Sequence, residues 1–157
     1  MKIVVQEGDF DAGAEARALS VSNPKVGAVV SFVGLVRDAN DGAQVATMRL
    51  EHYPGMTERA IGTIVEQARA RWEVIDCTVI HRVGALKPTD QIVLVVVASG
   101  HRGDAFEACA FIMDYLKTRA PFWKKEATPE GERWVAARAT DDAAASRWAT
   151  AKDEKGV

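Results

Sequence analysis

The feature that most constrains the fold is the segment DQIVLVVVAS at residues 90–99, which is almost uninterrupted in apolar, mostly β-branched side chains. A run of this kind is typical of a strand that lies inside a sheet rather than at its edge. A second strand is predicted over VIDCTVIHRVG at 74–84, and the turn ALKPT, which contains Pro88, joins the two. We therefore expect the strand at 90–99 to lie centrally in a sheet.

Two more strands are expected earlier in the chain. The segment VGAVVSFVGLVRD at 26–38 is rich in valine, with a glycine near each end, and DANDGAQ at 38–44 has the composition of a loop. The segment VATMRLEHY at 45–53 follows the two-residue period of a half-buried strand. We expect the strands at 26–38 and 45–53 to pair as a hairpin.

Helical spacing of apolar residues predicts a helix over 54–72, with Thr57 as its N-cap, and a second over 103–119. Pro121 ends the second helix because proline lacks the amide that a helix interior needs. Residues 122–127 are then extended, 129–134 turn into a short strand, and a last helix is expected near 141–150. With 157 residues and no repeat or linker, the chain fits a single α+β domain.

Composition excludes some classes of function. The formal net charge of −2 argues against nucleic acid as a partner, because binding to phosphates needs a basic face. Nothing approaches the roughly 20 apolar residues of a membrane helix, and the N-terminus does not resemble a secretory signal. The two cysteines, Cys77 and Cys109, are predicted to be small buried apolar residues. We expect a cytoplasmic protein without a metal site.

The stretch HRGDAFEACAFIMDYLKTRAPFWKKE at 101–126 holds most of the candidate functional residues. Lys117 falls in the last turn of the predicted helix and Lys124 follows in extended chain, so the bend at Pro121 lets both amines face one pocket. Alternation along the strand puts Lys124 on the same face as Glu126. Two close ammonium groups in a partly dry pocket depress each other's pKa, which favours a base or nucleophile. The alternative is that Lys117 only complements its helix dipole.

Two other places in the sequence suit an anionic ligand. His101 and Arg102 lie in the junction between the strand at 90–99 and the following helix, where free amides and a basic pair form a phosphate cradle. Arg37 ends the strand at 26–38, from which it points either into a site or simply into solvent. A solvated turn is the alternative interpretation of the His101 junction.

These motifs resemble those of the catalytic (large) subunits of molybdopterin synthase. The resemblance is carried, in order, by GAVVSFVGLVRD, LEHYPGMTE, HRVGALKPTD, SGHRGDAFEACAFIMDYLKTRAPFWKKE and TPEGERWV, and it runs from about residue 26 to about residue 138. It implies an α/β hammerhead-like fold of the α+β class with an additional antiparallel sheet. The tail at 149–157 lies beyond the match and is expected to be flexible.

The resemblance also implies an activity and its partners. Enzymes of this family are sulfurtransferases that convert cyclic pyranopterin monophosphate into molybdopterin, in molybdenum cofactor biosynthesis, by installing the two sulfurs of its dithiolene. The sulfur comes from a thiocarboxylate on the C-terminal Gly-Gly tail of a small ubiquitin-like subunit. The family forms a homodimer with one small subunit at each end, a heterotetramer overall. No cofactor is implied, because the pterin phosphate is substrate and the partner supplies the sulfur.

Site residues follow from the matched motifs. Lys117 and Lys124 correspond to the family's two catalytic lysines, and His101 with Arg102 to the pair that binds the substrate phosphate across the dimer interface. The other residues expected to bind substrate are Leu35, Val36, Arg37, Lys125 and Glu126, and Phe32, Met113 and Arg138 are further candidates for the pocket wall.

The chain departs from the family's usual sequence at three places. Leu35 and Asp38 stand where many relatives have lysine and asparagine, and Gly103-Asp104 replaces a serine-rich pair. Asp104 either loosens phosphate binding through its charge or caps the helix.

Two other functions compete with sulfur transfer. A binding module would hold a phosphate ligand or an acidic tail without transferring sulfur, even from a competent thiocarboxylate. An acyltransferase with Lys117 as nucleophile would give an adduct with a carbonyl substrate that borohydride traps.

Overall fold

The computed structural model describes residues 1–136 and 138–149. The apolar strand predicted at 90–99 is β8 (Gln91–Ser99), and it lies inside a four-stranded sheet as expected. The order of that sheet is β1 (Lys2–Gln6), β6 (Asp76–Arg82), β8 and β2 (Ala28–Leu35). Both neighbours of β8 run antiparallel to it, whereas β1 runs parallel to β6. Every residue of β8 from Val93 to Ser99 is buried.

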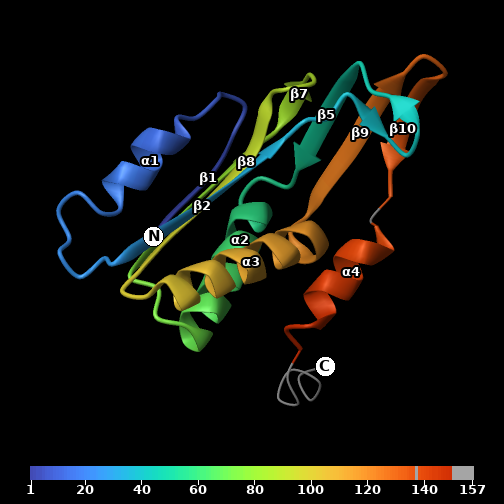
Figure 1. The fold of residues 1–157 in the computed structure, drawn as a ribbon. Helices are drawn as coiled ribbons and strands as arrows, with labels where there is room; N and C mark the ends of the chain where they lie inside the picture. Colours follow the sequence, from blue (N-terminus) through green and yellow to red (C-terminus); the bar gives the residue numbers. More distant parts are fainter. Residues whose placement is uncertain (137, 150–157) are drawn as a thin grey trace.

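Both faces of this sheet are covered, which explains why β8 is apolar on every side (Figure 1). Its odd-numbered valines join a core with α2 (Met56–Arg71) and α3 (Arg102–Arg119), and Leu94 and Val96 join a smaller core with α1 (Ala12–Ala18). Alternation along a strand sends successive side chains to opposite faces, so two helix layers require a continuous apolar run.

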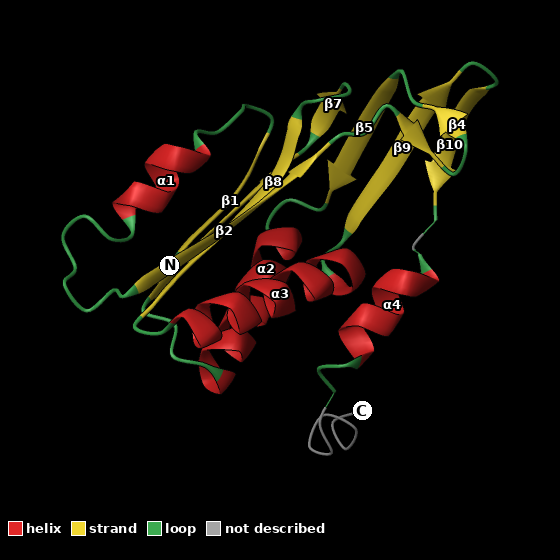
Figure 2. Cartoon of the chain, viewed as in Figure 1, coloured by secondary structure: helices red, strands yellow, loops and turns green. Residues whose placement is uncertain are grey.

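A second, antiparallel sheet extends from the end of the first (Figure 2). Its order is β10 (Gly131–Val135), β9 (Phe122–Thr128), β5 (Thr47–His52) and β7 (Gly84–Leu86). A separate core where the two sheets meet contains Val36, Met48, Leu50, Val83 and Leu86. The chain thus has the mixed α+β class, with the additional antiparallel sheet that was predicted.

Two short segments complete the described fold. The loop predicted at 38–44 is a small hairpin of β3 (Ala39–Asn40) and β4 (Ala43–Gln44), turning at Asp41 and Gly42 with φ of 51° and 77°. Positive φ at both central residues is the geometry that Asp-Gly favours. The last helix is α4 (Ala139–Ser146), somewhat earlier than predicted, and residues 150–157 of the expected flexible tail lie outside the described residues.

Two predictions about local structure were wrong. Strands β2 and β5 do not form a hairpin, because β2 pairs with β8 while β5 lies between β7 and β9. Thr57 is not the N-cap of α2: the N-cap is Gly55, two residues earlier, and its amide donates to the Glu58 carboxylate at 2.6 Å. Both cysteines are buried and free, as predicted. None of the helices in the described part of the chain is long and apolar enough to span a membrane.

Candidate active site

The bend between α3 and β9 brings the two candidate lysines to one cavity. Lys117 lies in the last turn of α3, and Lys124 lies on β9 beyond Pro121. The buried hydroxyl of Thr57 donates to the Pro121 carbonyl at 3.1 Å and accepts the amide of Tyr53 at 3.1 Å. Thr57, wrongly predicted as a cap, therefore ties the bend to the start of α2.

The cavity lies where the two sheets, the end of α3 and the start of α4 meet, and its volume is about 660 Å³. Its charged lining comprises four cations and two carboxylates: Arg37, Lys117, Lys124, Arg138, Glu126 and Asp141. The apolar side chains that line the cavity include Phe32, Leu35, Val36, Met48, Leu50 and Met113. A pocket with an apolar wall and an excess of positive charge suits an organic anion.

A buried carboxylate organises one side of this cavity. Glu126 is 2% exposed, and it accepts a hydrogen bond from the amide of Asn40 at 2.8 Å and from Arg133 at 3.2 Å. Its Oε1 also lies 4.0 Å from Nζ of Lys124. The oxygen of the Asn40 amide accepts a hydrogen bond from Arg138. The hairpin β3–β4 is thereby linked to both a lysine and an arginine of the pocket.

Lys124 is held in an environment that disfavours its charge. Burial lowers the pKa of Lys124 from its ordinary value, Glu126 opposes this, and the nearby cations Lys117, Arg138 and Arg37 lower it further. The side chain is 35% exposed, so the lysine remains accessible from the cavity. The depression of the pKa by Lys117 agrees with the sequence argument, although burial is the larger cause.

Helix α4 forms the outer wall of the cavity and is held by one acidic side chain of α3. Asp114 accepts hydrogen bonds from the indole of Trp148 at 2.6 Å and from Arg147 at 3.0 Å. The Trp148 ring packs edge-on against Phe111 and Trp72, at centroid distances of 5.6 Å and 5.4 Å. These contacts set the position of the segment that carries Arg138 and Asp141 into the cavity.

Three predicted site residues lie outside the cavity. Lys125 projects from the opposite face of β9, where Nζ is 2.8 Å from Glu132, so it does not line the pocket of its own chain. His101 and Arg102 are exposed at the other end of α3, which rises about 22 Å between Arg102 and Lys117 at about 1.5 Å per residue. Neither side chain of this pair reaches the cavity of its own chain.

The junction at residues 99–104 has a structural role as well. The carboxylate of Asp104 accepts the backbone amide of Glu73 at 3.0 Å, which ties the start of α3 to the chain that follows α2. The N-cap of α3 is His101, whose side chain makes no capping hydrogen bond. Asp104 thus bonds to another segment rather than capping its own helix.

Sequence reasoning missed Asn40 and His81, which both line the cavity. Asn40 lies in a segment whose composition indicated only a turn, and its bond to Glu126 joins positions 86 residues apart. His81 lies in the predicted strand at 74–84, to which no functional residue was assigned. Its position after Cys77 and Val79, on the same face of β6, was the available signal.

The arrangement is that of a mixed α+β enzyme with a cationic pocket between its two sheets. The family described as MoaE protein matches residues 5–119. The molybdopterin synthase catalytic subunit of Ralstonia nicotianae is 64% identical over 151 residues, which cover 96% of this chain and 86% of that protein. The molybdopterin synthase catalytic subunit of Cereibacter sphaeroides is 52% identical over 148 residues, which cover 94% of this chain and 100% of that protein. The chain belongs to the MoaE family.

Solved structures agree with this assignment. The molybdopterin biosynthesis MoaE protein from Burkholderia ambifaria is 59% identical with a TM-score of 0.80, and the match covers 94% of this chain and 97% of that one. A protein–protein complex of subunits 1 and 2 of the molybdopterin-converting factor from Helicobacter pylori is 19% identical with a TM-score of 0.70. That match covers 87% of this chain and 91% of that one, and it is a likeness of fold.

Proposed function

We propose that this protein is the catalytic subunit of a molybdopterin synthase, which transfers sulfur from a partner's thiocarboxylate to cyclic pyranopterin monophosphate. The observation that carries the proposal is the convergence of Lys117 and Lys124 on one cavity, in a chain that is 64% identical to a curated subunit of that name. The cavity's positive charge suits both anions of the reaction, the substrate phosphate and the thiocarboxylate.

The geometry supports a division of roles within the pocket. Lys117 and Lys124 neutralise the thiocarboxylate, whose sulfur forms a bond to a substrate carbon while the bond from that carbon to an oxygen breaks and the departing oxygen takes up a proton. Water then cleaves the bond between that sulfur and the partner's acyl carbon, which leaves an ordinary carboxylate on the partner. Because its pKa is lowered, Lys124 is the better placed of the two to move a proton. Arg37 and Arg138 orient the substrate, a positioning role.

The partner that fits this pocket is a small ubiquitin-like subunit whose C-terminal Gly-Gly tail is thin enough to enter it. The Helicobacter pylori neighbour, itself a complex of two subunits, favours such an assembly. Two free thiols, Cys77 and Cys109, agree with a reducing compartment, so we place the protein in the cytoplasm.

We further infer that a second copy of the chain completes each site. His101 and Arg102 lie about 22 Å along α3 from Lys117, so they serve a phosphate only in the pocket of another protomer. The assembly that we propose on this basis is a homodimer with one small subunit on each protomer.

Reconstituted turnover tests the reaction. Purified protein, a small subunit bearing a C-terminal thiocarboxylate and cyclic pyranopterin monophosphate should yield molybdopterin. Lys117→Ala should abolish product while the melting temperature and dimer are retained, and Lys87→Ala, at an exposed lysine that does not line the cavity, is the matched control. Binding of both components without product in the unaltered protein would favour a binding module instead.

Mixed dimers test the shared site. Lys117→Ala and the double variant His101→Ala/Arg102→Ala should each be inactive alone. After subunit exchange, half of the dimers hold one intact site, so about a quarter of the unaltered activity should return. No recovery, despite demonstrated exchange, would show that the pair does not act across the interface.

A further inference from the structure

His81 is an imidazole in the pocket wall to which the proposed sulfur transfer gives no role. It lies near the end of β6 and shares the helix-covered face of that strand with Cys77 and Val79. It lines the same cavity as Lys117 and Phe122. An ionisable ring at this position is either a packing element or a group that contacts the ligand, and its hydrogen bonds distinguish the two.

The orientation of the His81 ring is set on two sides. It stacks on Phe122, with ring centroids 3.8 Å apart and planes inclined by 18°. Its Nδ1 lies 2.8 Å from the backbone carbonyl of Arg82. A carbonyl oxygen only accepts, so Nδ1 carries the hydrogen, and Nε2 of the neutral ring is left with an acceptor lone pair.

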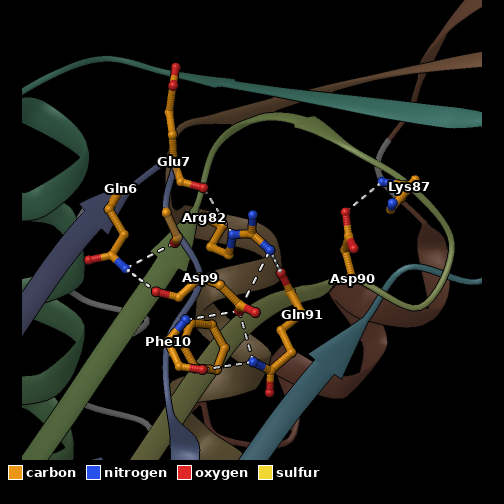
Figure 3. A network of polar contacts seen from close by, with 9 residues as sticks. Gln6, Glu7, Asp9, Phe10, Arg82, Lys87, Asp90 and Gln91 are labelled. Carbon is orange, nitrogen blue, oxygen red and sulfur yellow. Dashed lines mark hydrogen bonds and ion pairs between the residues drawn. The ribbon is translucent and has the colours of Figure 1, made fainter.

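A polar network on the far side of the sheet holds the Arg82 backbone in place (Figure 3). The Arg82 guanidinium donates to the carbonyls of Glu7 and Gln91, at 3.0 Å each, and lies 3.7 Å from the Asp9 carboxylate. The Gln91 amide donates to that same carboxylate at 2.8 Å. Arg82 is thus anchored to the segment after β1 and to β8, and its carbonyl is a fixed acceptor for the His81 ring.

The surroundings of His81 keep it neutral. Burial lowers the pKa of His81 to about 4, and Lys117 on α3 and His52 on β5 add to this, against the hydrogen bond to Arg82. The other charged side chains that line the cavity are Lys124, Arg37 and Arg138, with the carboxylates of Glu126 and Asp141.

The Nε2 atom is free to bind a ligand. It has no hydrogen-bond partner among the described residues, and those residues hold no side-chain nitrogen or oxygen that is both fully buried and unpaired. Nε2 is therefore open to the cavity. Phe122, on which the His81 ring stacks, lines the cavity together with Leu116 and Met113, and such apolar side chains suit a flat ring.

We propose that His81 is a substrate-recognition residue, whose Nε2 accepts a hydrogen bond from an N–H donor of the bound heteroaromatic ring. The ring lies against His81 and Phe122, while the cations that line the cavity hold the anionic groups of the ligand. The identity of that ring as a pterin rests on the proposed function. The acceptor role follows from the neutral ring and its fixed tautomer.

Kinetics of two replacements test the contact. His81→Phe keeps a ring to stack on Phe122 but has no acceptor, whereas His81→Gln places an amide oxygen near the former Nε2. For a hydrogen bond worth about 1 kcal/mol, His81→Phe should raise KM for the pterin phosphate about 3- to 10-fold, with a smaller change in kcat. His81→Gln should recover most of the loss. An unchanged KM in a folded, dimeric His81→Phe protein would overturn the proposal.

Nitrogen NMR of the unaltered protein tests the same contact without a variant. In protein with 15N-labelled histidine, Nε2 of His81 should appear unprotonated from about pH 5 to about pH 8 and shift when the pterin phosphate is added. A protonated Nε2, or a signal that does not move at saturating ligand, would overturn the proposal. If instead the unaltered enzyme makes no molybdopterin while this signal shifts, the proposed reaction fails and the recognition role stands.

Discussion

Replacing Glu126 with glutamine removes a buried carboxylate that lies among three basic or amide groups, at almost constant shape. In the structure its oxygens face the Asn40 amide at 2.8 Å, Arg133 at 3.2 Å and Lys124 at 4.0 Å. Glutamine carries an amide group in place of one oxygen, so at least one donor of the network faces another donor. The change therefore removes a charge and a hydrogen bond together.

The size of the effect follows from burial. Breaking a fully buried ion pair costs about 3–5 kcal/mol, but Arg133 and Lys124 are 39% and 35% exposed, so water offsets much of that cost. A donor left unpaired adds about 1–3 kcal/mol. We expect the free energy of unfolding to fall by about 2–4 kcal/mol, which for a domain of this size lowers Tm by roughly 5–12 °C.

Activity should respond through Lys124. Glu126 raises the pKa of Lys124 against the burial that lowers it, so its removal lowers that pKa further. In Glu126→Gln, the part of the pH profile of kcat/KM that reports the titration of Lys124 should therefore move to lower pH. This direction holds whether the reaction needs the charged or the neutral amine.

Glu132→Gln is the matched control, because this carboxylate lies on the neighbouring strand with its partner Lys125 on the opposite face. It should leave both Tm and the pH profile near those of the unaltered protein. Equal losses of Tm in the two variants, or a titration of Lys124 that moves to higher pH in Glu126→Gln, would refute the reasoning.

Three further predictions concern other parts of the molecule. Because the pKa of His81 is about 4 in the folded protein and 6.5 ordinarily, the unfolded chain binds more protons between these values. The contribution of His81 to the free energy of unfolding should therefore be present above about pH 6.5 and be lost toward pH 4, by up to about 3 kcal/mol. Urea titrations of His81→Phe should lack this part of the pH dependence. Asp114→Asn weakens the bonds that hold Trp148, so amides of α4 should lose hydrogen-exchange protection while those of β8 keep theirs; unchanged protection of α4 would contradict this role. Burial raises the pKa of Cys77 to about 12 and that of Cys109 to about 11, so iodoacetamide at about pH 8 should modify both thiols only after unfolding; equal rates in the folded protein would refute it.

Local signals in the sequence predicted which segments form strands and helices better than they predicted which strands lie side by side. The apolar run of β8 and the proline after α3 are local features, and both predicted elements are confirmed. The pairing of β5 was missed because its partner β9 lies more than 60 residues further along the chain, and the two-residue period reports which side chains are buried, not which strand lies alongside. Strand β1 and helix α1 have five and seven residues, too few to carry a clear period.

The same distinction holds in the pocket. Lys117 and Lys124 were predicted to converge because the bend and the strand alternation between them are local. Asn40 and His81 were not, because a turn asparagine and a strand histidine gain their roles only from segments distant in sequence. His101 and Lys117 were predicted at opposite ends of the helix at 103–119, and they lie at opposite ends of α3.

The alternation of side chains along β9 makes this part of the chain sensitive to length rather than to composition. Phe122, Lys124 and Glu126 face the cavity, whereas Trp123 is 40% exposed and Lys125 lies on the far face. Inserting or deleting one residue between Pro121 and Lys124 would exchange the two faces, placing an indole and the wrong amine in the cavity. Point substitutions in this segment should lower activity to different degrees, but an in-frame insertion or deletion of a single codon should abolish it. The seven-residue interval between the two lysines can therefore change in sequence, through evolution or protein engineering, but not in length.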